Sequence, residues 1–187
     1  MNVFKNYING EWVESKSGKT FPNVNPANTD ETVGLFQSSN TEDVDRACRA
    51  AAAARTAWAD LPATRRGEYL FKAAELVEQR LQQIGEEMTR EEGKTLAESR
   101  GELQRSINVA EFCAGESRRM NGETIPSELP LNFAYTIKQP LGVVACVTPW
   151  NFPVAIPIWK IAPASTMTVP DSCCSVTEGD SPTKDRR

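Results

Sequence analysis

The sequence predicts an α/β protein, in which helices pack against a short parallel sheet. Long stretches between residues 40 and 121 repeat apolar side chains with a helical period. Residues 142–148 (GVVACVT) form a continuous apolar run, which is typical of a strand buried on both faces of a sheet. A turn with two prolines follows this run directly and precedes an apolar segment that suits a helix.

The composition is that of a globular protein and excludes several classes of partner. Of the 187 residues, 40% are hydrophobic and 25% are charged, close to the average. The net charge is −4, and lysines and arginines alternate with acids, so we expect no nucleic-acid partner. The first residues lack the apolar core of a secretory signal, and no stretch reaches the ~18 apolar residues of a membrane span. We therefore expect a cytoplasmic protein without membrane contact.

The cysteines and the absence of histidine limit the possible chemistry. Five cysteines without a CxxC spacing, in a chain without histidine, predict no metal site and reduced thiols. An imidazole of this chain cannot be the base of a catalytic reaction. The adjacent Cys173 and Cys174 lie in a polar segment without the positive surroundings that activate a thiol, so we assign them no role.

The N-terminal part is predicted to be an extended arm. Two short strands between Val3 and Ser15 are joined at Asn9-Gly10, a pair that favours the type I′ turn of a β-hairpin. Residues 16–30 are rich in Gly, Pro, Asn and Ser and indicate a loop. Residues 31–38 alternate well enough to predict one more strand.

Three helical segments are predicted to follow. The first begins after the cap residue Asn40, and its alanines indicate close packing against a neighbouring element. The second runs from residue 62 to 93, and the third begins with a capping box of Thr95 and Glu98 and ends near residues 121–122. The side chains predicted to face the core are Leu70, Ala74, Val77, Leu81, Ile84 and Met88 in the second segment, and Leu103, Ile107, Ala110 and Ala114 in the third.

Four acidic side chains on these helices resemble a carboxylate site. They are Glu91, Glu92, Glu98 and Glu102. Charged residues are mostly exposed in proteins, so we interpret them as solvated helix surface and assign them no chemistry.

The turn after the buried strand is the candidate site. Ligands of open α/β sheets bind at the carboxyl ends of strands, where residues 149–153 (PWNFP) lie. Taken alone, Asn151 would more often be a turn residue bonded to its own backbone, and Trp150 and Phe152 would be core aromatics. For Lys160, the alternative to a role in the site is a charge that is solvated on the surface of a helix.

Residues 140–153 (PLGVVACVTPWNFP), continuing to Trp159-Lys160, resemble the aldehyde dehydrogenase superfamily, whose PWNFP signature occupies this position. The segments INGEWV, NPAN, LPATRRGEYL, EEGKTLAES and EFCAGESRRMNGETIPS follow in the order that the family uses. The resemblance covers about residues 4–164. It is nearest in appearance to bacterial members that oxidise semialdehydes, such as the ketoglutaric semialdehyde dehydrogenases.

The resemblance implies a Rossmann-type cofactor domain, a catalytic domain and a small β oligomerisation element. Residues 1–164 would form part of the cofactor-binding domain, with residues 130–140 contributing an oligomerisation strand. The catalytic domain would be absent, so we expect a truncated fragment. Residues 165–187 depart from the family and indicate a disordered polar tail, which a frameshift or alternative splice could have introduced.

In the family reaction a cysteine thiolate attacks the aldehyde, hydride passes to NAD or NADP, and a glutamate-activated water releases the carboxylate. The resemblance implies that the amide of Asn151, with a backbone N–H, holds the oxyanion. It also implies that Val147, Thr148, Pro149 and Trp150 line the cofactor. The nucleophilic cysteine, the glutamate and the pyrophosphate turn have no counterpart in this chain, so we expect no turnover by it alone.

A non-catalytic alternative stays open. The strand at residues 132–139 and the helices could dock onto a full-length homologue as an interaction module and form inactive mixed oligomers. A gene product that does not accumulate is the third possibility.

Overall fold

The computed structural model describes residues 1–139, 141–166 and 173–177, the last of these by backbone only. In chain order, the elements are β1 (Val3–Phe4), β2 (Asn6–Ile8), β3 (Glu11–Val13), β4 (Thr20–Val24), β5 (Thr32–Gln37), α1 (Thr41–Ala59), α2 (Ala63–Gln79), α3 (Leu81–Glu92), α4 (Leu96–Glu116), β6 (Thr124–Ile125), β7 (Ala134–Tyr135), β8 (Val144–Thr148), α5 (Ala155–Thr166) and β9 (Cys173–Thr177). The mixture of helices and strands confirms the predicted α/β class.

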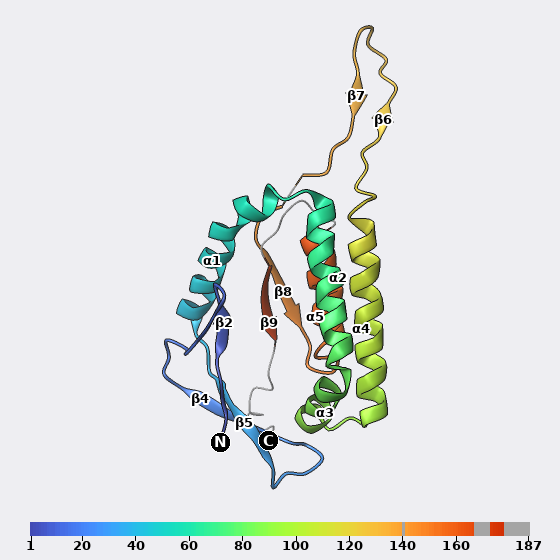
Figure 1. The fold of residues 1–187 in the computed structure, drawn as a ribbon. Helices are drawn as coiled ribbons and strands as arrows, with labels where there is room; N and C mark the ends of the chain where they lie inside the picture. Colours follow the sequence, from blue (N-terminus) through green and yellow to red (C-terminus); the bar gives the residue numbers. More distant parts are fainter. Residues whose placement is uncertain (140, 167–172, 178–187) are drawn as a thin grey trace, which may run out of the picture.

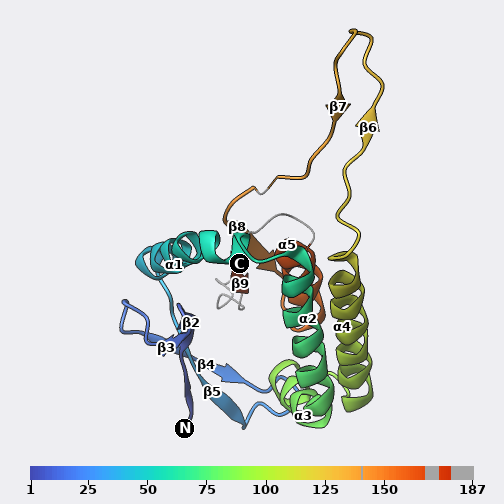
Figure 2. The same cartoon turned by 45° about the horizontal axis from the view of Figure 1, so that its top comes forward.

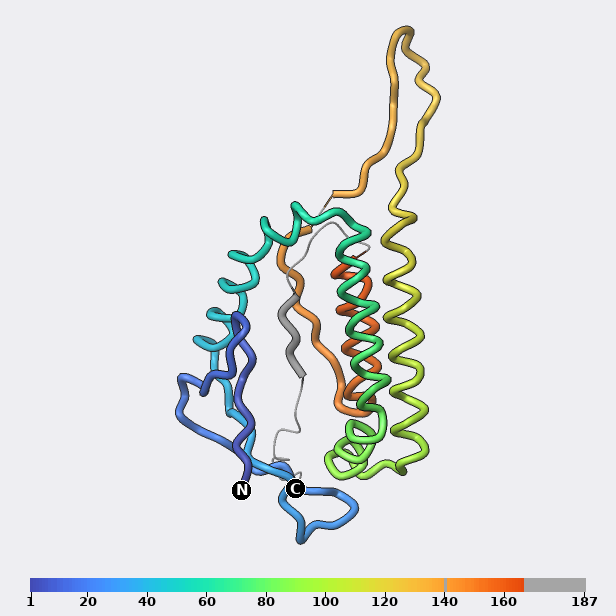
Figure 3. The backbone as a smooth tube through the Cα atoms, in the orientation of Figure 1, coloured from blue at the N-terminus to red at the C-terminus, as the bar shows by residue number. Residues whose placement is uncertain are grey.

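Helices α2, α4 and α5 run side by side, and the short α3 lies at one end of this group (Figure 1). Strands β8 and β9 lie between these helices and α1, as the turned view also shows (Figure 2). The backbone trace shows the N-terminal strands on the same side of the molecule as α1 (Figure 3). Strands β6 and β7 form a long hairpin that projects away from the rest of the chain.

The core lies between α2, α4 and α5. Ala74, Ile107 and Ala110 form its buried cluster. The partly buried apolar side chains packed against them are Val77, Leu81 and Ile158. Leu103 and Ala114 are also buried, so the inward positions predicted for the helix after Thr95 are confirmed. Each Å² of apolar surface removed from water in this way contributes roughly 25 cal/mol.

The N-terminal hairpin has the predicted turn. Strands β2 and β3 pair in antiparallel fashion, and Asn9 and Gly10 have φ values of 54° and 80°, as a type I′ turn requires. The strand predicted at residues 31–38 is β5, which pairs with β1 on one side and β4 on the other. The loop predicted at residues 16–30 was wrong in part, because β4 lies within it. Pro22 is tolerated there because β4 is an edge strand and pairs on one side only.

Asp43 joins the N-terminal arm to α1. Its carboxylate, on a residue only 2% exposed, accepts hydrogen bonds from the Ser15 hydroxyl at 2.5 Å and from the Lys16 amide at 2.9 Å. It also accepts from the Asn40 amide at 3.1 Å and so completes a capping box. Burial alone would raise the pKa of Asp43, but these hydrogen bonds outweigh burial and hold the pKa below its ordinary value.

The predicted second helix is two helices. Its apolar spacing continues without interruption, yet α2 and α3 are separated at Arg80, whose backbone leaves the helical region with φ −108° and ψ 13°. The stop at Gly93 is confirmed, since this residue has φ 81°. Helix α4 ends at Glu116, a few residues before the predicted end near residues 121–122.

The alanines of α1 do not pack closely against a neighbour within the described part of the chain. Of the alanines predicted to face a neighbour, Ala54 is exposed and Ala47 and Ala51 are only half-buried, and Asp43 is the one buried residue of this helix. Alanine side chains allow a neighbouring element to approach α1 closely, but they do not ensure that such an element is present. The expectation of close packing was therefore wrong. Helix α1 contacts β2 and β9.

The strand predicted at residues 132–139 is much shorter. Only Ala134–Tyr135 form β7, which pairs with β6. Of the residues predicted to form the tail, 165 and 166 are the end of α5, which continues to Thr166, and Cys173–Thr177 form β9, parallel to β8. The rest of that prediction concerns residues 167–172 and 178–187, which lie outside the described residues.

None of the helices in the described ranges combines the length and the apolarity needed to cross a membrane.

We expect Asp43→Asn to change how stability depends on pH. Because the folded-state pKa of Asp43 is lowered, its contribution to stability is present above the unfolded-state pKa and is lost as the pH falls through the folded one. In urea unfolding at neutral pH the variant should lose roughly 1 kcal/mol or more. In strong acid the difference from the wild type should shrink. Asp45→Asn, on the exposed surface of the same helix, is the control and should cost less than about 0.5 kcal/mol. A difference that is the same at both pH values would contradict the assignment.

Two glycines should respond to alanine in opposite ways. A Cβ atom at Gly67 would lie 2.7 Å from the carbonyl oxygen of Ala114, against the end of α4. Gly67→Ala should therefore destabilise the chain by about 1–3 kcal/mol. At Gly101, apart from its chain neighbours and the nearby backbone of its own helix, no described atom lies within 4 Å of such a Cβ, so Gly101→Ala should stabilise α4 by roughly 0.5–1 kcal/mol. Urea unfolding measures both, and a neutral or stabilising Gly67→Ala would show that the two helices do not meet there.

Candidate functional site

The candidate site lies at the carboxyl end of β8. The strand turns Cys146 and Thr148 inward, whereas Ala145 and Val147 are exposed. Strand β9 pairs with it in parallel, with Thr148 opposite Thr177. Burial on both faces was predicted for β8, but the described residues cover one face only, because helix α5 packs on one side. The side that carries Val147 is open.

The residues predicted to line a cofactor differ in accessibility. Val147 is 48% exposed and Trp150 is 57% exposed, and Pro149 between them is also exposed. Thr148 is buried, and its hydroxyl has no hydrogen-bond partner among the described residues. The exposed three form a mostly apolar surface at the end of the strand.

Asn151 stands in the middle of the turn that follows β8. Asn151 is exposed, and its side-chain amide makes no hydrogen bond within the described ranges. The alternative interpretation, a turn residue whose amide bonds to its own backbone, is therefore not found. Its backbone carbonyl, in contrast, accepts a hydrogen bond from Lys94 Nζ at 3.2 Å. The backbone of Asn151 is therefore held in place while its amide points to no partner in the described chain.

Glu102 of α4 anchors the start of α5. One carboxylate oxygen accepts hydrogen bonds from the backbone amides of Val154 and Ala155, both at 3.0 Å. The other oxygen accepts from Lys94 Nζ, and the Glu102 side chain is only 1% exposed. The first amides of a helix have no partner within the helix and lie at its positive end. A remote carboxylate thus supplies the cap that the turn itself lacks.

Lys94, between α3 and α4, joins this carboxylate to the turn. Its Nζ lies 2.8 Å from a carboxylate oxygen of Glu92 and also pairs with Glu102. The same Nζ lies 4.8 Å from the centroid of the Phe152 ring, a cation–π contact. Burial alone would lower the pKa of Lys94, but the two carboxylates outweigh burial and raise it. Burial raises the pKa of Glu92, against the opposing effect of Lys94.

The interpretation of the acidic cluster as solvated surface was wrong for two of its members. Beside Lys94, Glu102 is buried and Glu92 is half-buried, with side chains 1% and 10% exposed. It was right for Glu98, an exposed residue that forms the predicted capping box with Thr95. Glu91 accepts a hydrogen bond from Asn23. One feature of the sequence could have indicated this arrangement. Lys94 lies between Gly93, which ends α3, and Thr95, which caps α4, so its side chain is not on the surface of either helix and can point toward the carboxylates.

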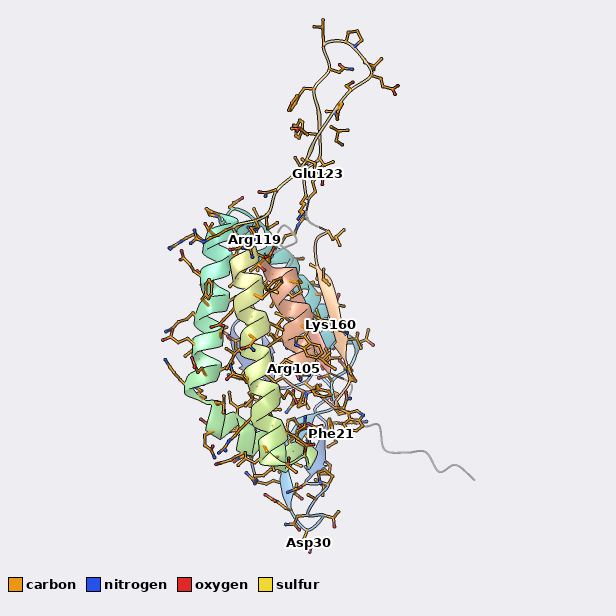
Figure 4. The ribbon with its side chains drawn as sticks, turned by 90° about the vertical axis from the view of Figure 1, so that its right-hand side faces the viewer. Phe21, Asp30, Arg105, Arg119, Glu123 and Lys160 are labelled. Atoms are coloured by element: carbon orange, nitrogen blue, oxygen red, sulfur yellow. The ribbon has the colours of Figure 1, made fainter. Side chains whose placement is uncertain are left out.

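Lys160 has a structural contact. Although the residue is exposed, its Nζ donates a hydrogen bond to the carbonyl of Val147. Figure 4 shows Lys160 on α5, beside β8. Lys160 therefore joins α5 to the end of β8 and is not merely a solvated charge on the helix surface.

The described residues bring no three His, Cys, Asp or Glu side chains together in a way that could hold a metal ion. Among the cysteines of the described residues, Cys113 and Cys146 are buried. Burial raises the pKa of the Cys113 thiol, which keeps it in its unreactive protonated form.

Comparison with known proteins agrees with this geometry. Residues 12–168 match the aldehyde dehydrogenase family. The chain is 50% identical over 163 residues to an alpha-ketoglutaric semialdehyde dehydrogenase of Bacillus subtilis, covering 87% of this chain and 33% of the relative. The chain therefore spans about a third of the length of this relative.

Solved structures give the same result. A 3,6-anhydro-L-galactose dehydrogenase superimposes with a TM-score of 0.89 at 31% identity, over 96% of this chain and 37% of that one. A point mutant of betaine aldehyde dehydrogenase from Staphylococcus aureus, solved with NAD+, gives 0.84 at 34% identity, over 92% and 34%. With the PWNFP turn at the end of β8 and the family match over residues 12–168, the chain belongs to the aldehyde dehydrogenase family.

Proposed function

We propose that this chain supplies the oxyanion-binding amide and part of the cofactor surface of an NAD(P)-dependent aldehyde dehydrogenase. The reaction is the oxidation of an aldehyde or semialdehyde to a carboxylate. The observation that carries the proposal is the amide of Asn151, exposed at the carboxyl end of β8 on a turn that buried side chains hold. The semialdehyde class is supported by the name of the Bacillus subtilis relative.

An amide suits the stabilisation of a developing oxyanion. It is uncharged, so it needs no counter-ion, and its N–H groups donate at every working pH. A preorganised donor of this kind lowers the barrier because it need not reorient as charge develops. In support of this role, the backbone of Asn151 is held by Lys94, and its amide has no competing partner among the described residues.

NAD or NADP would accept the hydride when bound. The residues of this chain that would hold the nicotinamide part are Val147, Thr148, Pro149 and Trp150. Support comes from their place at the carboxyl end of a parallel strand, from the exposure of three of them, and from the unpartnered hydroxyl of Thr148. The related betaine aldehyde dehydrogenase was solved with NAD+.

A complementation experiment tests this function. The chain alone should produce no NADH or NADPH, measured by absorbance with short aldehydes and semialdehydes. Mixed with a polypeptide that carries the remaining part of the Bacillus subtilis relative, it should give turnover. Asn151→Ala should then lower kcat by roughly 10²–10³-fold, the usual effect of removing one oxyanion donor.

The matched control is Asn108→Ala, an exposed asparagine on α4 outside the site, which should leave kcat within about twofold because surface changes have small effects. Turnover by the chain alone, or equal rates for wild type and Asn151→Ala in the mixture, would contradict the proposal.

A second function is favoured by the β6–β7 hairpin. This hairpin projects beyond α4, with Glu123 at its base (Figure 4). Its exposed apolar side chains are Ile125, Leu129, Leu131, Phe133, Tyr135 and Ile137. Exposed apolar side chains gathered on one element are typical of a docking surface. The chain could therefore bind an intact homologue as a non-catalytic subunit of a mixed oligomer.

Co-expression with the full-length homologue tests this second function. The tagged chain should retain the homologue on an affinity column, and Phe133→Asp, which places a charge on the hairpin, should reduce that retention at least about tenfold. Phe112→Asp changes an exposed phenylalanine of α4 instead and should retain it as the wild type does. A chain that elutes as a monomer beside the homologue in sizing chromatography would argue against this function.

A further inference from the structure

We infer that Glu102 and Lys94 are positioning residues, whose buried ion pair sets the direction of the Asn151 amide. The inference rests on the proposed function, because it assigns a purpose to the place where Asn151 is held. Neither side chain would touch the aldehyde or the cofactor in this role. Both act through the backbone of the turn between β8 and α5.

The two side chains make four contacts with a short turn. Glu102 holds the amides of Val154 and Ala155 at its end, both at 3.0 Å. Lys94 holds the carbonyl of Asn151 in its middle, at 3.2 Å, and lies against the Phe152 ring. The carbonyl of Asn151 lies in the same rigid peptide plane as the Asn151 Cα atom, from which the side chain begins. Fixing the carbonyl of Asn151 therefore restricts where its amide can point.

The charge of the pair matters as well as its hydrogen bonds. Glu102 is almost completely buried and Lys94 is 13% exposed, so water screens their attraction only weakly. Hydrogen bonds with a charged partner are roughly twice as strong as neutral ones. A neutral glutamine at position 102 could still accept from both amides with its one carbonyl oxygen, but these would be weaker, neutral hydrogen bonds, and its NH₂ group could not pair with the ammonium. The ammonium would then be held by Glu92 alone and would be drawn from the turn.

The structure also separates this pair from the ordinary packing of the helices. The apolar core cluster is formed by Ala74, Ile107 and Ala110, and the pair is not a member of it. The hydrogen bonds between the Glu102 side chain and the α5 region go to the amides at the start of that helix. Changing the charge of the pair should therefore make the amides of the turn exchange faster, while the amides of the apolar core keep their protection.

The test is hydrogen exchange and amide NMR on the full 187-residue chain. In Glu102→Gln the amides of Val154 and Ala155 should exchange at least about tenfold faster, while the amide of Ile107 in the core stays within about twofold. In Lys94→Met the side-chain NH₂ resonances of Asn151 should shift and broaden. Lys94→Arg keeps the charge and a donor, and should restore most of the wild-type signal.

Glu111→Gln is the matched control, because Glu111 is an exposed carboxylate of the same helix, and it should leave all of these signals unchanged. Unchanged exchange at Val154 and Ala155 in Glu102→Gln would overturn the inference. So would an equal acceleration at Ile107, which would show a general loss of stability. If Glu102→Gln does not fold, Lys94→Met and Lys94→Arg decide it by the Asn151 resonances. None of these signals needs turnover, so failure of the complementation assay would count against the proposed function alone.

Discussion

The carboxylate of Glu102 is the contact on which the candidate site depends. A buried charge is costly unless hydrogen bonds and an opposite charge surround it. Here the partners come from two other parts of the chain: the first amides of α5 and the ammonium of Lys94. One side chain thereby ties α4, the connection before it and the turn after β8 together. The Asn151 turn keeps its place because leaving this carboxylate unpaired would be unfavourable.

Around this contact the molecule has a closed side and an open side. Helices α2, α4 and α5 bury a shared apolar core, and α5 covers one face of β8. On the other face, Val147 and much of α1 are exposed, and the β6–β7 hairpin stands away from the rest. Parallel sheets are usually covered on both faces. The open side is therefore the surface on which the proposed cofactor contacts and the proposed docking hairpin lie.

Prediction from sequence succeeded where the signal was local. The Asn9-Gly10 turn, the stop at Gly93 and the capping box of Thr95 each depend on conformational preferences within a few residues, and all three are present. It failed where the signal depended on neighbours far along the chain. Strand β4 exists because β5 offers it an edge, and the break at Arg80 interrupts an apolar pattern that continues unchanged on either side.

The sequence by itself determined the α/β class, the family and the turn that carries Asn151, because a run of apolar residues followed by PWNFP is a local, specific pattern. Only the tertiary structure decided what holds that turn. Glu92 and Glu102 have the composition of a solvated helix surface, and their burial follows from how α3, α4 and α5 meet around Lys94. Burial and pairing are properties of the packed chain, since the free energy of a charge depends on what surrounds it in space.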